Sequence, residues 1–334
     1  MPPLSAIVLV GGFGTRLRPV TYHVPKQLIP MAGQCALYHV FDILPKNVDR
    51  IGLACGYKGE VIERYLREHP YPLPVSVVRE ATPLGTGGGM KNAENLATDP
   101  FILLNGDVVS GVDISAMIKW LNEKGGVGVM SLFHVDDTTP YGVADLGPDY
   151  RIRRFVEKPD PASAPSHWIN AGASVWRREI MEAVPAGKAV SFEREILPGL
   201  LEQGVFGLPF DSWWEDAGTL PRVLNAQRIL FTHPERRRTP WNTPEGNFVM
   251  PPVAVGAGVT IEAKRVGPYV TLGNGVSAEE GVVIEDAVIM DGAKIGRGAH
   301  VKHSIIGPGY YVAAGARVEN ACLALTPSET PEKT

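Results

Sequence analysis

Residues 6–19 read AIVLVGGFGTRLRP and decide the fold class of the N-terminal part of the chain. Five apolar residues, Ala6–Val10, lead directly into a glycine-rich turn. A short apolar run that ends in glycines is typical of a buried strand followed by a tight turn. Similar strand-like runs follow at Arg50–Ala54, Val75–Arg79, Phe101–Leu104 and Gly126–Phe133.

Amphipathic, helix-like stretches separate these runs. They cover Ala36–Leu44, Glu60–Arg67, Gly89–Ala97 and Ile114–Lys124. This alternation predicts an α/β domain with a Rossmann-like, mainly parallel sheet. Ligands of such sheets bind beyond the carboxyl ends of the strands. The loops Gly11–Arg16, Gly85–Gly88 and Asn105–Asp107 are therefore the expected place of a site.

The C-terminal part of the chain has a different pattern, in which branched aliphatic residues recur every six positions. The repeats are Val253 and Val259; Val270, Val276, Val282 and Val288; Ile295 and Val301; and Ile306, Val312 and Val318. A six-residue period with interspersed glycines predicts a hexapeptide parallel β-helix, whose coils cover one another's apolar faces. We predict an α/β domain over 1–231, a Pro- and Arg-rich linker over 232–252, the β-helix over 253–322 and a tail over 323–334.

Composition narrows the class of protein. The 334 residues carry a net charge of −4 and only three scattered cysteines. This favours a cytoplasmic protein without disulfides, a zinc site or a nucleic-acid interface. No apolar run reaches the roughly 20 residues that span a bilayer, and a basic segment typical of a signal peptide is absent from the N-terminal sequence. The expected state is a homo-oligomer, since stacked coils present faces that can pair.

The glycine turn carries the first chemical signal. Gly11, Gly12 and Gly14 would let backbone N–H groups approach phosphate oxygens, and Arg16 could bind a polyphosphate with both arms of its guanidinium. Taken alone, the turn is equally compatible with an ordinary βα connection. Lys26, between Pro25 and Pro30, adds a second cation.

These residues belong to a series of motifs in a fixed order. The others are Pro83–Gly88, Asn105–Asp107, Tyr141–Val143, Phe155–Pro159, Asn170–Gly172, Ser191–Ile196 and Trp213–Thr219. With Gly11–Pro19 and Pro25–Pro30, the series resembles the sugar-1-phosphate nucleotidyltransferases over about residues 1–220. A left-handed hexapeptide β-helix often follows the catalytic domain in that family. Gln27 and Gly87 depart from the Pro-Lys-Pro and Gly-Thr-Ala of many relatives.

The resemblance implies a reaction and a set of roles. A sugar 1-phosphate oxygen attacks the α-phosphorus of a nucleoside triphosphate and pyrophosphate leaves, so cations rather than a covalent nucleophile are needed. The implied catalytic residues are Arg16, Lys26, Asp107 and Lys158. The implied nucleotide-binding residues are Gly11, Gly12, Gly14, Thr15, Arg16, Glu80, Gly85 and Thr86. The sugar phosphate would meet Gly142, Glu157, Lys158 and Asn170, and Mg²⁺ would bind Asp107 and Asp216, with Glu215 as an alternative to Asp216.

Within that family, Glu80–Gly88 followed by Gly-Met-Lys-Asn-Ala looks most like guanylyltransferases that act on mannose 1-phosphate. GTP and mannose 1-phosphate are therefore the expected substrates, with thymidylyl or adenylyl transfer to glucose 1-phosphate as the alternative. A non-catalytic regulatory subunit would be expected to have lost Arg16, Lys26, Asp107 or Asp216, and all four are present. An acyltransferase role for the β-helix, with His300 or His303 as base, would need a longer helix.

Overall fold

The computed structural model describes residues 3–237 and 241–326. Their contacts divide the chain into two compact units. The first unit comprises Met1–Gly12 and Ile43–Trp214, and the second comprises Phe13–Asp42 and Glu215–Thr334. The predicted glycine turn is thus shared, because the chain leaves the first unit after Gly12.

Four parallel strands form the centre of the first unit. They are β1 (Leu4–Leu9), β4 (Val48–Cys55), β5 (Val75–Arg79) and β6 (Phe101–Asn105), in the order β6-β1-β4-β5. Ile7 and Val8 of β1 are fully buried, as expected for a strand covered on both faces. The predicted parallel α/β core is confirmed.

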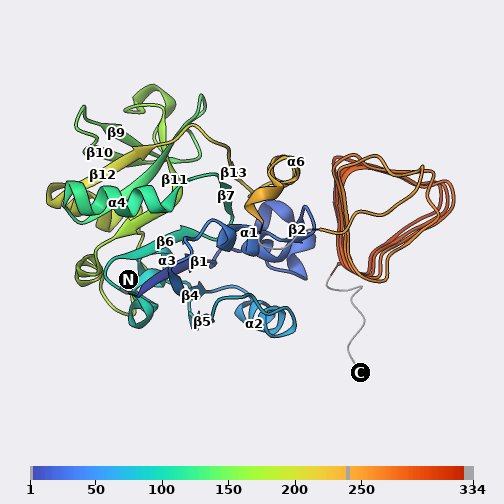
Figure 1. Cartoon of the computed structure of the whole chain (residues 1–334), viewed down its shortest axis with the longest axis horizontal. Helices are drawn as coiled ribbons and strands as arrows, with labels where there is room; N and C mark the ends of the chain where they lie inside the picture. Colours follow the sequence, from blue (N-terminus) through green and yellow to red (C-terminus); the bar gives the residue numbers. More distant parts are fainter. Residues whose placement is uncertain (1–2, 238–240, 327–334) are drawn as a thin grey trace. The chain divides into compact units, whose positions relative to one another are not determined.

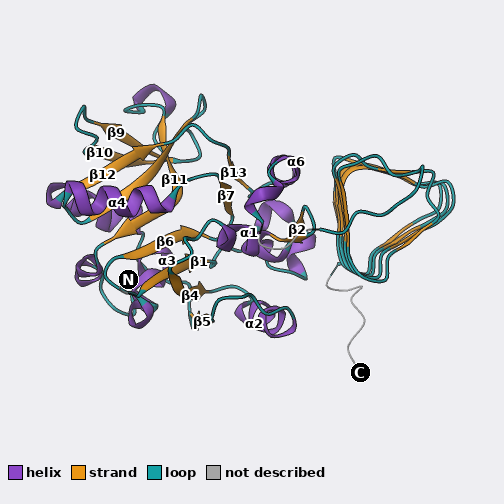
Figure 2. Cartoon of the chain, viewed as in Figure 1, coloured by secondary structure: helices purple, strands orange, loops and turns teal. Residues whose placement is uncertain are grey.

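From β6 the sheet continues as mainly antiparallel strands, which the pattern of apolar runs did not indicate (Figure 2). These are β8 (Gly128–His134), β9 (Gly142–Leu146), β10 (Ile152–Glu157), β11 (Trp168–Trp176) and β12 (Val205–Pro209). β11 is the hub, since it pairs antiparallel with β6, β8 and β9. Its register shifts between Asn170 and Ser174, so the backbone bulges where the sequence predicts a sugar contact.

The predicted helices of the first unit begin within one residue of the expected positions, with one exception, and a further helix over Leu197–Leu200 was not predicted. The helices of this unit are α2 (Gly59–Glu68), α3 (Gly85–Asn92), α4 (Ile114–Lys124) and α5 (Leu197–Leu200), with short turns η4 (Glu94–Leu96), η5 (Pro161–Ser163), η6 (Arg178–Ala183), η7 (Phe192–Ile196) and η8 (Leu201–Gln203). The exception is α3, which starts at Gly85. The expectation of a loop over Gly85–Gly88 was wrong, because N–H groups of this segment bond a second segment at Val190 and hold it helical.

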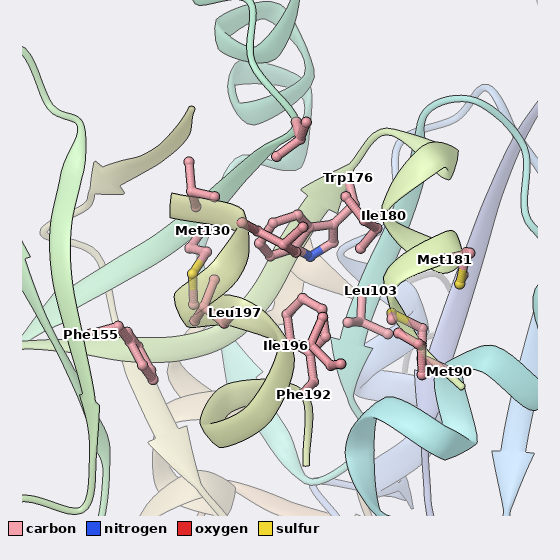
Figure 3. Close-up of a cluster of buried hydrophobic side chains, with 14 of the residues drawn as sticks. Met90, Leu103, Met130, Phe155, Trp176, Ile180, Met181, Phe192, Ile196 and Leu197 are labelled. Carbon is pink, nitrogen blue, oxygen red and sulfur yellow. The ribbon is translucent and has the colours of Figure 1, made fainter. Parts of the chain in front are cut away.

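A cluster of buried side chains fills the first unit beneath the sheet (Figure 3). Trp176 is fully buried and meets Phe192 edge to face, with ring centroids 5.0 Å apart. Met90, Leu103 and Ile196 lie in the same cluster. The core therefore joins α3, β6 and the turn η7, all of which lead into the site described below.

The second unit begins with a coiled loop and two helices. Its elements are η1 (Thr15–Leu17), η2 (Val20–Tyr22), η3 (Lys26–Leu28), the hairpin β2 (Pro30–Met31) and β3 (Gln34–Cys35), α1 (Ala36–Asp42), α6 (Leu220–Thr232) and η9 (Pro234–Arg236). β7 (Val108–Ser110) belongs to the first unit, and β13 (Trp214–Asp216) passes from the first unit to the second. Arg237 of the predicted linker donates to the carbonyl of Ala32, with its Nη1 2.5 Å from the oxygen, so this residue packs on the hairpin.

The rest of the second unit is a parallel β-helix, which appears in Figure 1 as stacked coils with a triangular outline. Its strands are β14 (Val253–Val255), β15 (Thr260–Ile261), β16 (Arg265–Val266), β17 (Val270–Leu272), β18 (Ser277–Ala278), β19 (Val283–Ile289), β20 (Lys294–Ile295), β21 (His300–Ile306), β22 (Tyr311–Val312), β23 (Arg317–Glu319) and β24 (Cys322–Leu323). The described pairings of these strands with one another are parallel.

The coils are 17 residues long, because Val253, Val270 and Ala287 lie opposite one another in neighbouring strands. A coil therefore contains two steps of six residues and one of five. This five-residue step places Ala287 on the inward side, so the prediction of Val288 as an inward hexad residue was wrong. Val288 points outward and pairs with Thr271 and Ile305.

Thr271, Val288 and Ile305 form an outward column, one residue from each of three neighbouring strands, and this outward column is nevertheless buried. Val288 and Ile305 are fully buried and Thr271 is 1% exposed. Helix α6 covers them, and the Thr271 hydroxyl donates to Oε1 of Gln227 on that helix at 2.6 Å. One face of the β-helix is therefore a packing surface for α6.

Candidate active site

The carboxyl ends of β1 and β6 place two predicted site segments next to each other in the first unit. Leu9 and Asn105 are register partners, and the Gly106 N–H donates to the carbonyl of Leu9 at 2.9 Å. A Cβ on Gly106 would lie 2.5 Å from the Val10 side chain, so only glycine allows this approach. Gly11 and Gly12 and the partly exposed Asp107 thus follow neighbouring strands at one sheet edge.

Glu80 lies at the same edge, surrounded by glycine backbone. Its Oε2 accepts the Leu84 N–H at 2.9 Å, and its own N–H donates to the carbonyl of Cys55 at 2.8 Å. A Cβ on Gly89 would lie only 2.7 Å from Oε1 of Glu80, and one on Gly11 would lie 3.9 Å away. The predicted nucleotide-binding residues Gly11 and Glu80 are therefore brought together.

Gly85 and Thr86 form the first turn of α3 and are held by a distant segment. A Cβ on Gly85, whose φ is +70°, would lie 2.6 Å from the carbonyl oxygen of Val190. The Thr86 hydroxyl accepts the Phe192 N–H at 2.9 Å and donates to Oε2 of Glu193 at 2.6 Å. The glycines of this motif thus serve chain packing, and the Thr86 hydroxyl is engaged within the protein.

The predicted sugar-phosphate residues gather at the ends of β9, β10 and β11. A Cβ on Gly142 would lie 2.7 Å from Oε2 of Glu157, so the missing side chain leaves room for that carboxylate. Lys158 has a positive φ of +52°, and its Nζ lies 3.7 Å from Oε1 of Glu157. In the bulge of β11, Oδ1 of Asn170 accepts the Gly172 N–H at 3.0 Å.

Electrostatics distinguishes Glu157 from an ordinary surface carboxylate. Its side chain is 18% exposed, against 56% for Lys158. Burial, and then the negative charge of Glu193, raise the pKa of Glu157, while Lys158 and Arg194 oppose the shift. Glu193 lies in the motif Ser191–Ile196, but no function was predicted for it from the sequence.

In the second unit, a hydrogen bond joins the two ends of the loop from Gly14 to Thr21. Thr15 and Arg16 within this loop are exposed to solvent. Gly14 has a φ of +63°, and its carbonyl accepts the Thr21 hydroxyl at 2.9 Å. A Cβ on Gly14 would lie 3.4 Å from the Cβ of Lys26, so the Lys26 turn is packed against the glycine turn. The predicted phosphate-binding residues Thr15, Arg16 and Lys26 therefore lie in one packed segment of the second unit.

Asp216 belongs to the same cluster of the second unit. A Cβ on Gly218 would lie 2.5 Å from Nη2 of Arg16 and 3.1 Å from Oδ1 of Asp216, which places both groups against Gly218. Arg222 lies 3.4 Å from the other oxygen of Asp216. Helix α6 has Thr219 as its N-cap residue, so Asp216 is not its cap.

Glu215 has a different environment. Its Oε2 accepts a hydrogen bond from the Asn225 side chain at 2.6 Å, and burial raises its pKa. A raised pKa disfavours the charged form that binds a cation. The Glu215 carboxylate is thus engaged by Asn225, whereas Asp216 lies beside the guanidinium of Arg222.

The tryptophans before Asp216 are only partly buried. Trp214 donates from Nε1 to the carbonyl of Ala171 at 3.0 Å and stacks on Phe133, with ring centroids 5.7 Å apart. Trp214 therefore supports the bulge of β11 beside Asn170.

Two other kinds of site are absent from residues 3–237 and 241–326. Those residues contain no helix that is long and apolar enough to cross a membrane. They also contain no group of three or more His, Cys, Asp or Glu side chains that could hold a metal ion by themselves.

Comparison with protein families identifies both parts of the chain. The model described as Nucleotidyl transferase matches residues 5–232, and the model described as GMPPB C-terminal domain matches residues 249–327. The mannose-1-phosphate guanylyltransferase of Mycobacterium tuberculosis is 36% identical over 222 residues, which is 65% of this chain and 61% of that protein. The match thus spans less than two thirds of that relative. The mannose-1-phosphate guanylyltransferase catalytic subunit beta of Danio rerio is 33% identical over 265 residues, 75% of this chain and 72% of that protein.

Solved structures agree with these matches. HddC from Yersinia pseudotuberculosis, crystallised in complex with GMP-PN, is 29% identical with a TM-score of 0.57 and covers 67% of this chain and 98% of its own. A putative glucose-1-phosphate thymidylyltransferase from Bacillus anthracis has a TM-score of 0.62 over 72% of this chain and 98% of its own; at 20% identity it shows the fold alone. With a family model that matches more than half of its length, and with the glycine turn and strand-end aspartate in place, the chain belongs to the nucleotidyl transferase family.

Proposed function

We propose that this protein transfers the guanylyl group of GTP to mannose 1-phosphate and releases pyrophosphate. The observation that carries the reaction class is the adjacency of the Gly11-Gly12 turn and Asp107 at the ends of the parallel strands β1 and β6. Backbone N–H groups and a carboxylate at one sheet edge suit a triphosphate and its metal.

The proposed reaction is an in-line displacement at phosphorus. An oxygen of the sugar 1-phosphate forms a bond to the α-phosphorus of GTP, and the bond from that phosphorus to the β-phosphate oxygen breaks. The attacking oxygen is already anionic, so no side chain is required to remove its proton. The protein's task is to hold two polyanions together in line.

Residues of the second unit would bind the triphosphate. The backbone around Gly14 and Thr15 offers N–H groups, and the exposed Arg16 can hold the leaving pyrophosphate with both arms of its guanidinium. Lys26, packed beside Gly14, would add a point charge near the reacting phosphates. Glu80 and Gly85 of the first unit would line the base.

The sugar phosphate would be bound by residues of the first unit. Lys158 would neutralise the phosphate and Glu157 would accept a hydrogen bond from a sugar hydroxyl. Gly142 leaves the space that this carboxylate needs, and Asn170 marks the bulge beside it. Each of these roles remains part of the proposal.

The donors present fit a divalent metal such as Mg²⁺. Asp107 and Asp216 offer carboxylate oxygens, the ligands that Mg²⁺ prefers, and phosphate oxygens and water complete its shell in such sites. When bound, the metal would neutralise charge on the phosphates, while Asp107 and Asp216 would hold it.

The names of the relatives support the choice of substrates. Proteins at 36% and 33% identity are called mannose-1-phosphate guanylyltransferases, and the GMP-PN complex contains a guanine nucleotide. Thymidylyl or adenylyl transfer to glucose 1-phosphate is the alternative. We further propose that the protein acts in the cytoplasm as a homo-oligomer.

A matrix of substrates tests this function. Pyrophosphate release is measured with four nucleoside triphosphates, each with mannose 1-phosphate and with glucose 1-phosphate, in the presence of Mg²⁺. We expect the highest kcat/KM for GTP with mannose 1-phosphate. A preference for another pair would replace the substrates, and no release with any pair would contradict nucleotidyl transfer.

A further inference from the structure

The segment after Ser191 is a wide turn anchored on both sides of Glu193. It is the five-residue π-helical turn η7, and the Ser191 hydroxyl accepts the Arg194 N–H at its start, at 3.3 Å. Phe192 and Ile196 are buried in the core cluster, as Figure 3 shows for these two labelled side chains. Glu193 between them is only partly buried. Isolated π turns occur frequently at functional sites.

Hydrogen bonds fix one oxygen of Glu193 and its rotamer. Oε2 accepts from the Thr86 hydroxyl at 2.6 Å and from the Ser191 hydroxyl at 3.3 Å. Thr86 is the donor of the first bond, because an ionised carboxylate only accepts hydrogen bonds, and the same Oγ1 accepts the Phe192 N–H at 2.9 Å. Over the described residues, the other oxygen, Oε1, accepts no hydrogen bond from the protein.

The turn that carries this carboxylate lies against a strand of the predicted sugar site. Turn η7 packs against β10, whose last residue is Glu157. The negative charge of Glu193 acts on Glu157 strongly enough to rank next to burial among the causes that raise the pKa of Glu157. Two carboxylates that repel each other destabilise a protein, so their proximity calls for a reason.

A ligand rich in hydroxyl groups supplies that reason. Ionised carboxylates only accept hydrogen bonds, and neighbouring hydroxyls of a sugar can each donate one. A hydrogen bond to a charged acceptor is about twice as strong as one between neutral groups. A purely structural acceptor for Thr86 would not need a charge opposite Glu157.

On the basis of the proposed function, we infer that Glu193 is a second carboxylate of the sugar site, which accepts a hydroxyl of the sugar 1-phosphate alongside Glu157. Thr86 is then a positioning residue for the sugar. This differs from the nucleotide-binding role that the motif Gly85-Thr86 suggests. Discrimination between sugars would depend on the pair Glu157 and Glu193.

Steady-state kinetics of the full chain tests this inference. Glu193→Gln keeps an acceptor for Thr86 and removes the charge. We expect it to raise the KM for mannose 1-phosphate about tenfold, since a charge-assisted bond becomes a neutral one, and to leave the KM for GTP within about twofold. Glu195→Gln is the matched control, because Glu195 lies on the same turn and, among the described residues, its carboxylate accepts a hydrogen bond from the Ser191 N–H alone; the KM values of this variant should stay at the wild-type level.

Deoxy analogues identify the contact itself. Mannose 1-phosphates that lack one hydroxyl at a time are compared in the wild type and in Glu193→Gln. We expect the wild type to lose about tenfold or more in kcat/KM on one analogue, and this loss to shrink to about threefold or less in the variant, because the partner is already weakened. A merely structural role of Glu193 would lower activity on all analogues equally and would contradict the inference.

Substitutions of Thr86 provide an independent test of the same inference. Thr86→Val should raise the KM for the sugar phosphate about threefold or more with no change for GTP, while Thr86→Ser should restore wild-type values. A rise confined to GTP would overturn the sugar-site assignment. If the wild type turns over no sugar 1-phosphate, the proposed function fails; if it does and Glu193→Gln behaves like the wild type, only this inference fails.

Discussion

Asp107 stands where the sheet edge, the glycine turn and the proposed metal meet. Asp107→Asn keeps the shape of the side chain but removes its charge, so a metal would lose one ligand. We expect turnover to fall by at least about a thousandfold while the circular dichroism spectrum and the melting temperature stay close to those of the wild type. Wild-type activity in this folded variant would remove Asp107 from the metal site.

Lys158 tests the assignment of the sugar phosphate. Its side chain is more than half exposed, and its backbone N–H donates to the carbonyl of Tyr141. Lys158→Ala should therefore leave the fold intact and raise the KM for the sugar phosphate by about ten- to a hundredfold. The KM for GTP, measured in the same assay, should change little, and an equal effect on both substrates would refute this role.

His39 gives the second unit a predictable dependence on pH. Its Nε2 donates to the carbonyl of Met31 at 2.7 Å, and burial lowers the pKa of His39 from 6.5 to about 3. The buried ring stays neutral, whereas the unfolded chain takes up a proton below pH 6.5. The contribution of His39 to the free energy of unfolding is thus fully present above pH 6.5 and is lost as the pH falls towards 3.

From this shift we expect a loss of about 2 kcal/mol between pH 7 and pH 5. Urea unfolding at both pH values measures it. His39→Gln, which can still donate to Met31, should show a smaller difference between the two pH values. An unchanged difference would assign the acid sensitivity to other groups.

At the scale of elements, sequence reasoning succeeded where a pattern is local. The predicted bounds of Val75–Arg79 and Ile114–Lys124 match β5 and α4, because apolar spacing and the Asp113 cap determine them. It failed for Gly85–Gly88, since glycine disfavours helices and the bonds to Val190 come from a segment far along the chain.

The same limit explains what was missed in the candidate site. Gly11, Asp107, Glu157 and Asp216 could be named because each lies in a short motif. The role of Glu193 depends on Thr86, which is 107 positions away in the sequence. No local pattern contains such a partner.

The contact between α6 and the β-helix leads to a prediction for this element. Ile305 is fully buried on the outward column beneath α6, whereas Tyr311 is 54% exposed on another face. Ile305→Ala should cost about 2–5 kcal/mol and lower the melting temperature, as for other buried isoleucines. Tyr311→Ala is the control and should change stability by less than about 0.5 kcal/mol. Equal effects would mean that α6 does not seal this face.

For the whole molecule, the proposed assembly can be measured directly. The last strands of the β-helix, β23 and β24, end the stack within the described residues, and exposed strand edges or coil faces tend to pair. We expect light scattering to give a mass that is a multiple of the 36.0 kDa of one chain. A single-chain mass at micromolar concentration would contradict the homo-oligomer.

The 17-residue coil has a consequence for how this chain can change length. Register partners lie 17 residues apart in the described ladders, from Ser277 to Lys294 as from Lys294 to Tyr311, except between β16 and β19, where Arg265 pairs with Val283 at an interval of 18. Removing or duplicating one whole interval keeps every inward side chain inward, so the solenoid can shrink or grow by complete rungs. A deletion of 16 or 18 residues would instead leave one coil a residue too long or too short, and a turn would have to absorb the difference, as it does at the 18-residue interval between Val266 and Ile284.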